Sequence, residues 1–172
     1  MIQRQPWFER QFTFDLPVAA APGVLERLRG TPARLAHRLS GVSPEVLTAR
    51  LGDRWSIQEN VGHLGDLEPL WLSRIEDLAA GRRMLQPADL ENRRTHEAHH
   101  NARPLPELLA RFEHARLDLV GQLERADEAD WLRSAVHPRL QTPMRLLDLA
   151  FFAAEHDDHH LATITYLLRA MA

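Results

Sequence analysis

Two histidines near the C-terminal end of the chain have the type and spacing to bind a metal ion. His156 and His160 lie in a segment whose apolar residues recur at helical spacing, so both imidazoles project from one face of a helix. Positions four apart are separated by about 6 Å along a helix axis, so both rings can reach one ion. The alternative is a pair of core histidines satisfied by hydrogen bonds, and the pair alone does not decide between the two.

A third histidine, on another predicted helix, favours the metal. His63 lies beside the apolar face of that helix and is expected to point inward. Three histidines leave coordination positions open, which is the layout of a catalytic site. One turn further on, Asp66 is predicted either to orient His63 or to hold water on the metal, and a solvated carboxylate is the alternative.

One arginine also falls on an inward helix face. Arg116 is predicted either to pair with a carboxylate such as Asp148 or to bind an anionic group of a substrate.

A competing histidine group lies in the polar segment 85–102, which is expected to be a loop with a short helix. Because its neighbours are polar on all sides, this group is expected to be solvated and to hold no second metal; it consists of His96, His99 and His100.

The elements that must position these residues are helices. A capping box at Ser56–Glu59 begins the clearest one, and Gly81 is its expected end. Thr before Pro is a good helix start, so the first helix is expected to be broken or kinked at Gly30-Thr31, and the last to begin at Thr142-Pro143. A further helix is predicted over 105–125, and nothing alternates with period two for long enough to predict a strand. The predicted fold is all-α, a four-helix bundle over 21–172 preceded by an extended arm over 1–20.

The amino-acid composition excludes several classes of function. A chain of 172 residues fits one domain, and a net charge of -3 gives no basic surface for nucleic acid. Cysteine and lysine are both absent, which excludes disulfides, protein thiolates and Schiff-base mechanisms. The sequence shows no membrane span and no signal peptide, so a cytoplasmic location is expected.

Several ordered motifs resemble a known family, the DinB-like superfamily, which includes YfiT-type metal-dependent hydrolases. The resemblance runs from about residue 20 to the C-terminus. The motifs are Trp55-Ser56-Ile57, His63-Leu64-Gly65-Asp66, Phe112-Glu113-His114-Ala115-Arg116, His137-Pro138 and His156-Asp157-Asp158-His159-His160.

That resemblance implies a four-helix bundle in which His63, His156 and His160 bind zinc or nickel. It also implies a homodimer and a small-molecule substrate. The family includes hydrolases and enzymes that use a low-molecular-weight thiol, and a chain without cysteine would need that thiol as a cosubstrate. The sequence leaves hydrolysis and thiol transfer open, and a non-catalytic metal-binding bundle with a structural or sensing role is the alternative.

Overall fold

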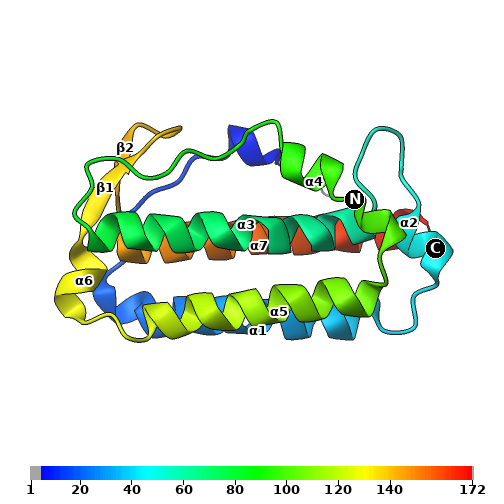
Figure 1. The fold of residues 1–172 in the computed structure, drawn as a ribbon, viewed down its shortest axis with the longest axis horizontal. Helices are drawn as coiled ribbons and strands as arrows, with labels where there is room; N and C mark the ends of the chain where they lie inside the picture. The colour runs from blue at the N-terminus through cyan, green and yellow to red at the C-terminus, as the bar shows by residue number, and fades with distance from the viewer. Residues whose placement is uncertain (1–4, 172) are drawn as a thin grey trace.

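Four long helices form the body of the molecule. The computed structural model describes residues 5–171. Helices α3 and α7 form one layer and α1 and α5 the other (Figure 1), and each helix of one layer contacts a helix of the other. The bounds are α1 Ala21–Leu39, α3 Ile57–Ala79, α5 Leu105–Leu123 and α7 Leu146–Ala170. This confirms the all-α four-helix bundle expected from the sequence.

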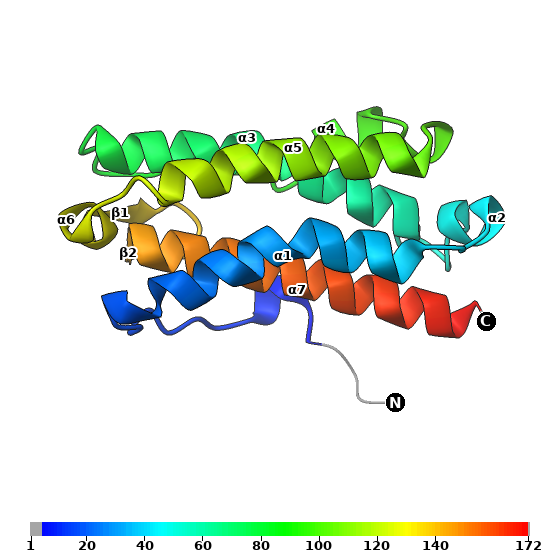
Figure 2. The ribbon, with the colours of Figure 1, turned by 90° about the horizontal axis from the view of Figure 1, so that it is seen from below.

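Shorter elements connect the long helices and cover one side of them. Figure 1 shows the N-terminal arm, a strand pair and α4 on the side of α3 and α7 that faces away from α1 and α5. From below, Figure 2 shows α1 beside α7, with the arm running along them. The short helices are α2 Pro44–Thr48, α4 Arg93–Glu97 and α6 Glu128–Leu132; 3₁₀ turns cover Trp7–Glu9, Val18–Ala20 and His100–Ala102; and the strands are β1 Ser134–His137 and β2 Thr142–Arg145. Within residues 5–171, no helix has both the length and the hydrophobicity to cross a bilayer.

Helix α3 begins and ends as predicted. The Ser56 hydroxyl accepts the backbone N–H of Glu59 at 3.0 Å, and the Glu59 carboxylate accepts the N–H of Ser56 at 2.8 Å. This reciprocal pair satisfies two donors that the first turn of a helix otherwise leaves free. After Ala79 the chain turns at Gly81, whose φ of 66° lies in the left-handed region that glycine adopts without strain. The helix that carries His63 is therefore fixed at both ends.

Helix α1 runs unbroken through Gly30-Thr31, so a break there, one of the two expected alternatives, was wrong. Pro32 lies inside the helix, and its missing N–H leaves the carbonyl of Leu28 without the usual partner one turn later. Arg116 of α5 donates to that carbonyl at 3.1 Å. Thr31 does not cap a helix; its hydroxyl donates to Asp157 at 2.8 Å. A donor from another helix thus replaces the bond that proline removes.

The last helix begins at Leu146, not at Thr142-Pro143, and the expectation of no strand was also wrong. Residues 142–145 form β2, which pairs antiparallel with β1 in the register Ser134↔Arg145 and His137↔Thr142. Pro143 is tolerated because a pair of strands has only edges. Asp148 instead closes the start of α7, accepting the backbone N–H of Arg145 at 2.9 Å and its side chain at 2.7 Å.

A buried ion cluster joins all four long helices. Arg116 has no exposed surface, and its guanidinium donates to Glu68 of α3 at 2.6 Å and to Asp157 of α7 at 3.0 Å. With the Leu28 carbonyl and Thr31, the cluster also includes α1. The predicted pairing of Arg116 with a carboxylate is therefore seen, but the partners are Glu68 and Asp157. The suggested partner, Asp148, pairs with Arg145 instead.

Replacing Arg116 by methionine should lower the free energy of unfolding by about 3–5 kcal/mol, because two buried carboxylates lose their counter-charge. The measurement is urea unfolding followed by circular dichroism. Arg29→Met is the matched control, because Arg29 forms only exposed ion pairs with Glu26 and Glu124 and should cost under about 1 kcal/mol. Equal losses in the two variants would show that the cluster does not brace the bundle.

Candidate metal centre

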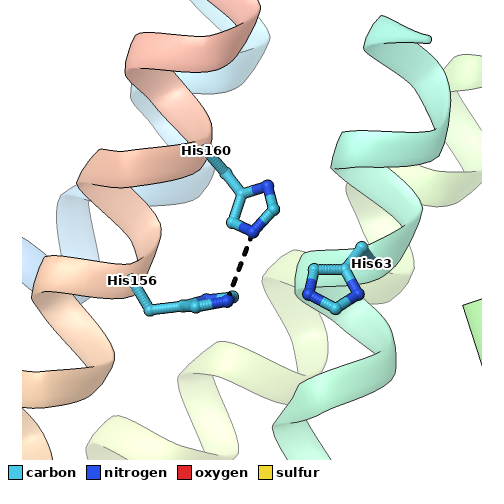
Figure 3. A group of neighbouring side chains, drawn as sticks. All are labelled: His63, His156 and His160. Atoms are coloured by element: carbon cyan, nitrogen blue, oxygen red, sulfur yellow. Dashed lines mark hydrogen bonds between the residues drawn. The ribbon is translucent and has the colours of Figure 1, made fainter. Parts of the chain in front are cut away.

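Three imidazoles meet between α3 and α7. One ring nitrogen from each of His63, His156 and His160 lies within 4.8 Å of those of the other two, and all three residues are buried. Figure 3 shows His63 on α3 facing the two histidines of α7, whose Nε2 atoms are 3.2 Å apart. The ring centroids of His63 and His160 are 4.8 Å apart. The structure therefore brings together the three histidines that the sequence selected.

Neighbouring side chains fix which nitrogen of two rings carries the proton. The amide nitrogen of Asn60 donates to the carbonyls of Trp55 and Ser56, so its oxygen must be the atom that accepts from Nδ1 of His160 at 2.8 Å. The hydroxyl of Thr95 donates to Asp66 at 3.1 Å and therefore accepts from Nδ1 of His63 at 2.9 Å. In neutral His63 and His160, the lone pair is then on Nε2, the atom that would bind a metal; in His160 this atom also contacts Nε2 of His156 at 3.2 Å.

Asp66 acts on His63 through Thr95 rather than by direct contact. Its carboxylate also accepts from Nε2 of His100 at 2.7 Å and from Arg111 at 2.8 Å. Although burial alone would raise the pKa of Asp66, the hydrogen bonds from His100 and Arg111 lower it. The solvated-carboxylate alternative for Asp66 is thereby excluded, since the residue is buried in a hydrogen-bonded network.

The expectation that the second histidine group is solvated was wrong for one member. His96 and His99 are exposed, but His100 is 1% exposed, and its ring lies against α3 at Gly62. A Cβ atom at Gly62 would come within 2.3 Å of that ring, so only glycine permits the contact. A glycine inside a well-capped helix was the sequence signal for this close approach.

The burial of the imidazoles keeps them neutral. Burial lowers the pKa of His63 to about 4, while the nearby Asp66 opposes the shift. Burial also lowers the pKa of His156 well below its usual value, and the positive charge of neighbouring groups adds to this. Nδ1 of His156 is buried and has no hydrogen-bond partner among residues 5–171. Three crowded imidazoles, of which burial keeps His63 and His156 neutral, fit a shared cation.

A cavity of about 1230 Å³ opens beside the three histidines. Its floor runs along α3 and α7, and the N-terminal arm and the hairpin β1–β2 form other parts of its wall. Trp7 of the arm packs edge-on against His156, with ring centroids 5.0 Å apart. The described part of the arm therefore packs against the body of the molecule. Arg116 does not line the cavity, because it is enclosed by the ion cluster.

The sequence from residue 27 to residue 164 matches the DinB superfamily. The chain belongs to the DinB superfamily. This confirms the resemblance inferred from the ordered motifs. No curated protein matches the sequence.

Two solved structures place this DinB-superfamily chain among known folds. YfiT from Bacillus subtilis is described as a probable metal-dependent hydrolase with an unusual four-helix bundle topology. It superposes with a TM-score of 0.83 over 95% of this chain and 94% of YfiT, at 19% sequence identity. A protein from Streptococcus pneumoniae gives a TM-score of 0.68 over 87% of this chain and 90% of its own, at 10% identity. Identities this low show a shared fold only.

The metal-free protein should lose stability as the pH falls from about 6.5 to 4. Burial holds the pKa of His63 at about 4 and that of His137 at about 3 in the folded state, whereas both rise to about 6.5 on unfolding. Below pH 6.5 the unfolded chain binds protons that the folded chain does not, so each residue lowers the free energy of unfolding by up to about 1.4 kcal/mol per pH unit.

Urea unfolding of chelator-treated protein between pH 7 and 5 measures this slope. His137→Gln should reduce it, and His114→Gln, at an exposed position of α5, should leave it unchanged. A free energy of unfolding that does not vary with pH in this range would contradict the assigned protonation states.

Proposed function

We propose that this chain is a metal-dependent enzyme in which His63, His156 and His160 bind one divalent transition metal, zinc or nickel. The observation on which the proposal rests is the position of the three rings at the wall of a large cavity. A metal that only braces a bundle is closed off by protein ligands. Here the histidines adjoin a volume that can admit a small molecule.

When bound, such an ion supplies Lewis-acid chemistry, activating water for hydrolysis or a low-molecular-weight thiol cosubstrate for transfer. The chain's own residues prepare the site for it. Thr95 and Asn60 hold the Nδ1 protons of His63 and His160, so that both rings offer Nε2. Asp66 is a positioning residue that acts through Thr95, and its negative charge partly offsets the positive charge that an ion would bring.

Arg116 fits a supporting role better than a catalytic one. Its donors are taken by Glu68, Asp157 and the Leu28 carbonyl, which leaves none for an anionic substrate group. The homodimer, the cytoplasmic location, the lack of a nucleic-acid partner and the domain boundary at residue 20 stay predictions of the sequence.

Elemental analysis of protein purified without an affinity tag tests the metal site. The wild type should contain about one equivalent of zinc or nickel, and His63→Ala, His156→Ala and His160→Ala should each lose it. His114→Ala, exposed on α5, is the matched control and should keep it. A His100→Asn variant that loses the metal while His160→Ala keeps it would overturn the assignment.

Turnover distinguishes an enzyme from a non-catalytic bundle. The metal-loaded protein is incubated with bacillithiol, mycothiol or glutathione and monochlorobimane, and in parallel with ester and amide substrates. Conjugation that disappears in His63→Ala would identify thiol transfer, and ester or amide cleavage that disappears in the same variant would identify hydrolysis. Lack of turnover in every assay, with a large fall in melting temperature on metal removal, would favour a structural metal instead.

Thr95→Val should weaken metal binding by about 10- to 100-fold, because His63 loses the acceptor that fixes its Nδ1 proton. Thr95→Ser keeps the hydroxyl and should restore the affinity. The measurement is competition for zinc with a chromophoric chelator, together with urea unfolding of the metal-free variants. If Thr95→Val lowers stability but leaves zinc affinity unchanged, the residue only anchors α4 and does not position His63.

A further inference from the structure

The cavity has a second polar end, formed by residues that the histidine site does not use. Arg74 near the end of α3, His137 of β1 and Arg139 of the hairpin turn line it together. Arg74 is 1% exposed, and among residues 5–171 no carboxylate forms an ion pair with it. Among the described residues its guanidinium forms one hydrogen bond, from Nε to the carbonyl of Gln86 at 2.9 Å, and it lies over the ring of Trp71, 5.5 Å from the centroid. A buried guanidinium that no carboxylate contacts directly is costly unless a ligand supplies a counter-charge.

His137 presents a donor to the same place. Its Nδ1 accepts the backbone N–H groups of Arg139 and Leu140 at 3.3 Å and 3.2 Å, so the proton of the neutral ring is on Nε2. Nε2 is buried and has no partner among the described residues, and the same is true of Nη2 of Arg139. Donors without acceptors therefore lie together at this end of the cavity.

The electrostatics of the three residues agree with this geometry. Burial lowers the pKa of His137 to about 3, and the positive charges of Arg74 and Arg139 lower it further. Burial likewise lowers the pKa of Arg74 to about 10, with Arg139 adding to the shift and Asp77 opposing it. Asp77 is already engaged by Arg82 and by the N–H of Gln86, so it does not neutralise Arg74 fully.

We propose that Arg74, His137 and Arg139 form a subsite for the oxyanion of a substrate, a carboxylate or a phosphate. The subsite deepens the proposed function and, as part of an active site, rests on it. Guanidinium groups bind planar or tetrahedral oxyanions through several charge-assisted hydrogen bonds, and the Nε2–H of His137 adds a neutral donor.

The space between the two polar ends defines the rest of the substrate. Arg74 lies eleven residues after His63, which is about 16 Å along α3 at 1.5 Å per residue. Trp71 and Phe152 lie between, with Trp71 5.9 Å from His156 and Phe152 5.3 Å from His137 between ring centroids. The geometry fits an elongated molecule whose acidic group is separated from its reacting group by an apolar or aromatic spacer.

Binding of 4-phenylbutyrate, 4-phenylbutyl phosphate and neutral 4-phenylbutanol tests the subsite without requiring turnover. Affinities are measured by calorimetry on chelator-treated and zinc-loaded protein. At least one anion should bind tenfold or more tightly than the alcohol in both forms, and the tighter anion identifies the class of oxyanion. Because metal-free protein is included, anion binding is tested independently of the metal. The subsite can be supported if the metal proposal is wrong, and the metal proposal can be supported if the subsite is wrong.

Variants decide whether the named residues cause the preference. Arg139→Gln and Arg74→Gln should each remove most of the advantage of the anion over the alcohol; Arg139 is only half-buried, so its variant serves if Arg74→Gln fails to fold. Arg54→Gln is the matched control, because Arg54 lines the same cavity beside Tyr166 of α7 and is exposed. Equal binding of anion and alcohol to the wild type, or an equal loss in Arg54→Gln, would overturn the proposal.

Discussion

The buried contact of Arg116 with Glu68 and Asp157 sets the relative position of the helices that carry the histidines. Glu68 lies five residues after His63 on α3, and Asp157 directly follows His156 on α7. One guanidinium bonded to both carboxylates therefore holds the two helices in a fixed register. A shift of one residue along either helix would move its histidine by 1.5 Å and rotate it by about 100°, which would separate the rings. The geometry of the histidine site thus depends on an interaction outside it.

Different faces of helix α7 contribute to the ion cluster and to the histidine site. Asp157 points toward α1 and α5, where it accepts from Thr31 and Arg116, while His156 and His160 point toward α3 and the arm. Because neighbouring residues of a helix differ in direction by about 100°, one helix can hold the core on one face and form the cavity floor on the next. Substitutions at Asp157 would therefore affect the site indirectly, through the helix register.

The fold could be predicted from the sequence where an element depends on neighbouring residues alone. The prediction failed where a residue distant in the sequence supplies a hydrogen-bond partner. The capping box at Ser56 and the spacing of His156 and His160 involve only neighbours in one helix, and the structure has both as predicted. Thr31-Pro32 looked like a helix start because the donor for the Leu28 carbonyl comes from α5, 88 residues away. Thr142-Pro143 also resembles a helix start. It instead pairs with β1 in a short hairpin, whose strands are too short to show an alternating pattern in the sequence.

The site follows the same rule. Two helical patterns, those of α3 and α7, sufficed to select the three histidines, because each pattern showed that its histidines face inward. The residues around them come from segments without a periodic pattern: Thr95 and His100 follow a polar loop, and His137 and Arg139 belong to the hairpin. Their roles depend on contacts with residues distant in the sequence. His100 contacts Asp66, and Arg139 lines the cavity. For that reason the polar neighbours of His100 predict a solvated side chain, although it is buried.

Taken together, the two ends of the cavity are chemically complementary to different parts of one molecule. Near α4, the histidines can offer nitrogen lone pairs to a cation, and near the hairpin, buried N–H groups have no acceptor among the described residues. Both ends lie on the wall of the same cavity, which the arm and the hairpin help to form, and a buried polar group there costs free energy unless it finds a partner. The aromatic rings of Trp71 and Phe152 lie between them. A ligand that satisfies both ends must therefore be polar at its two extremities, and its orientation in the cavity is fixed by which end is negative.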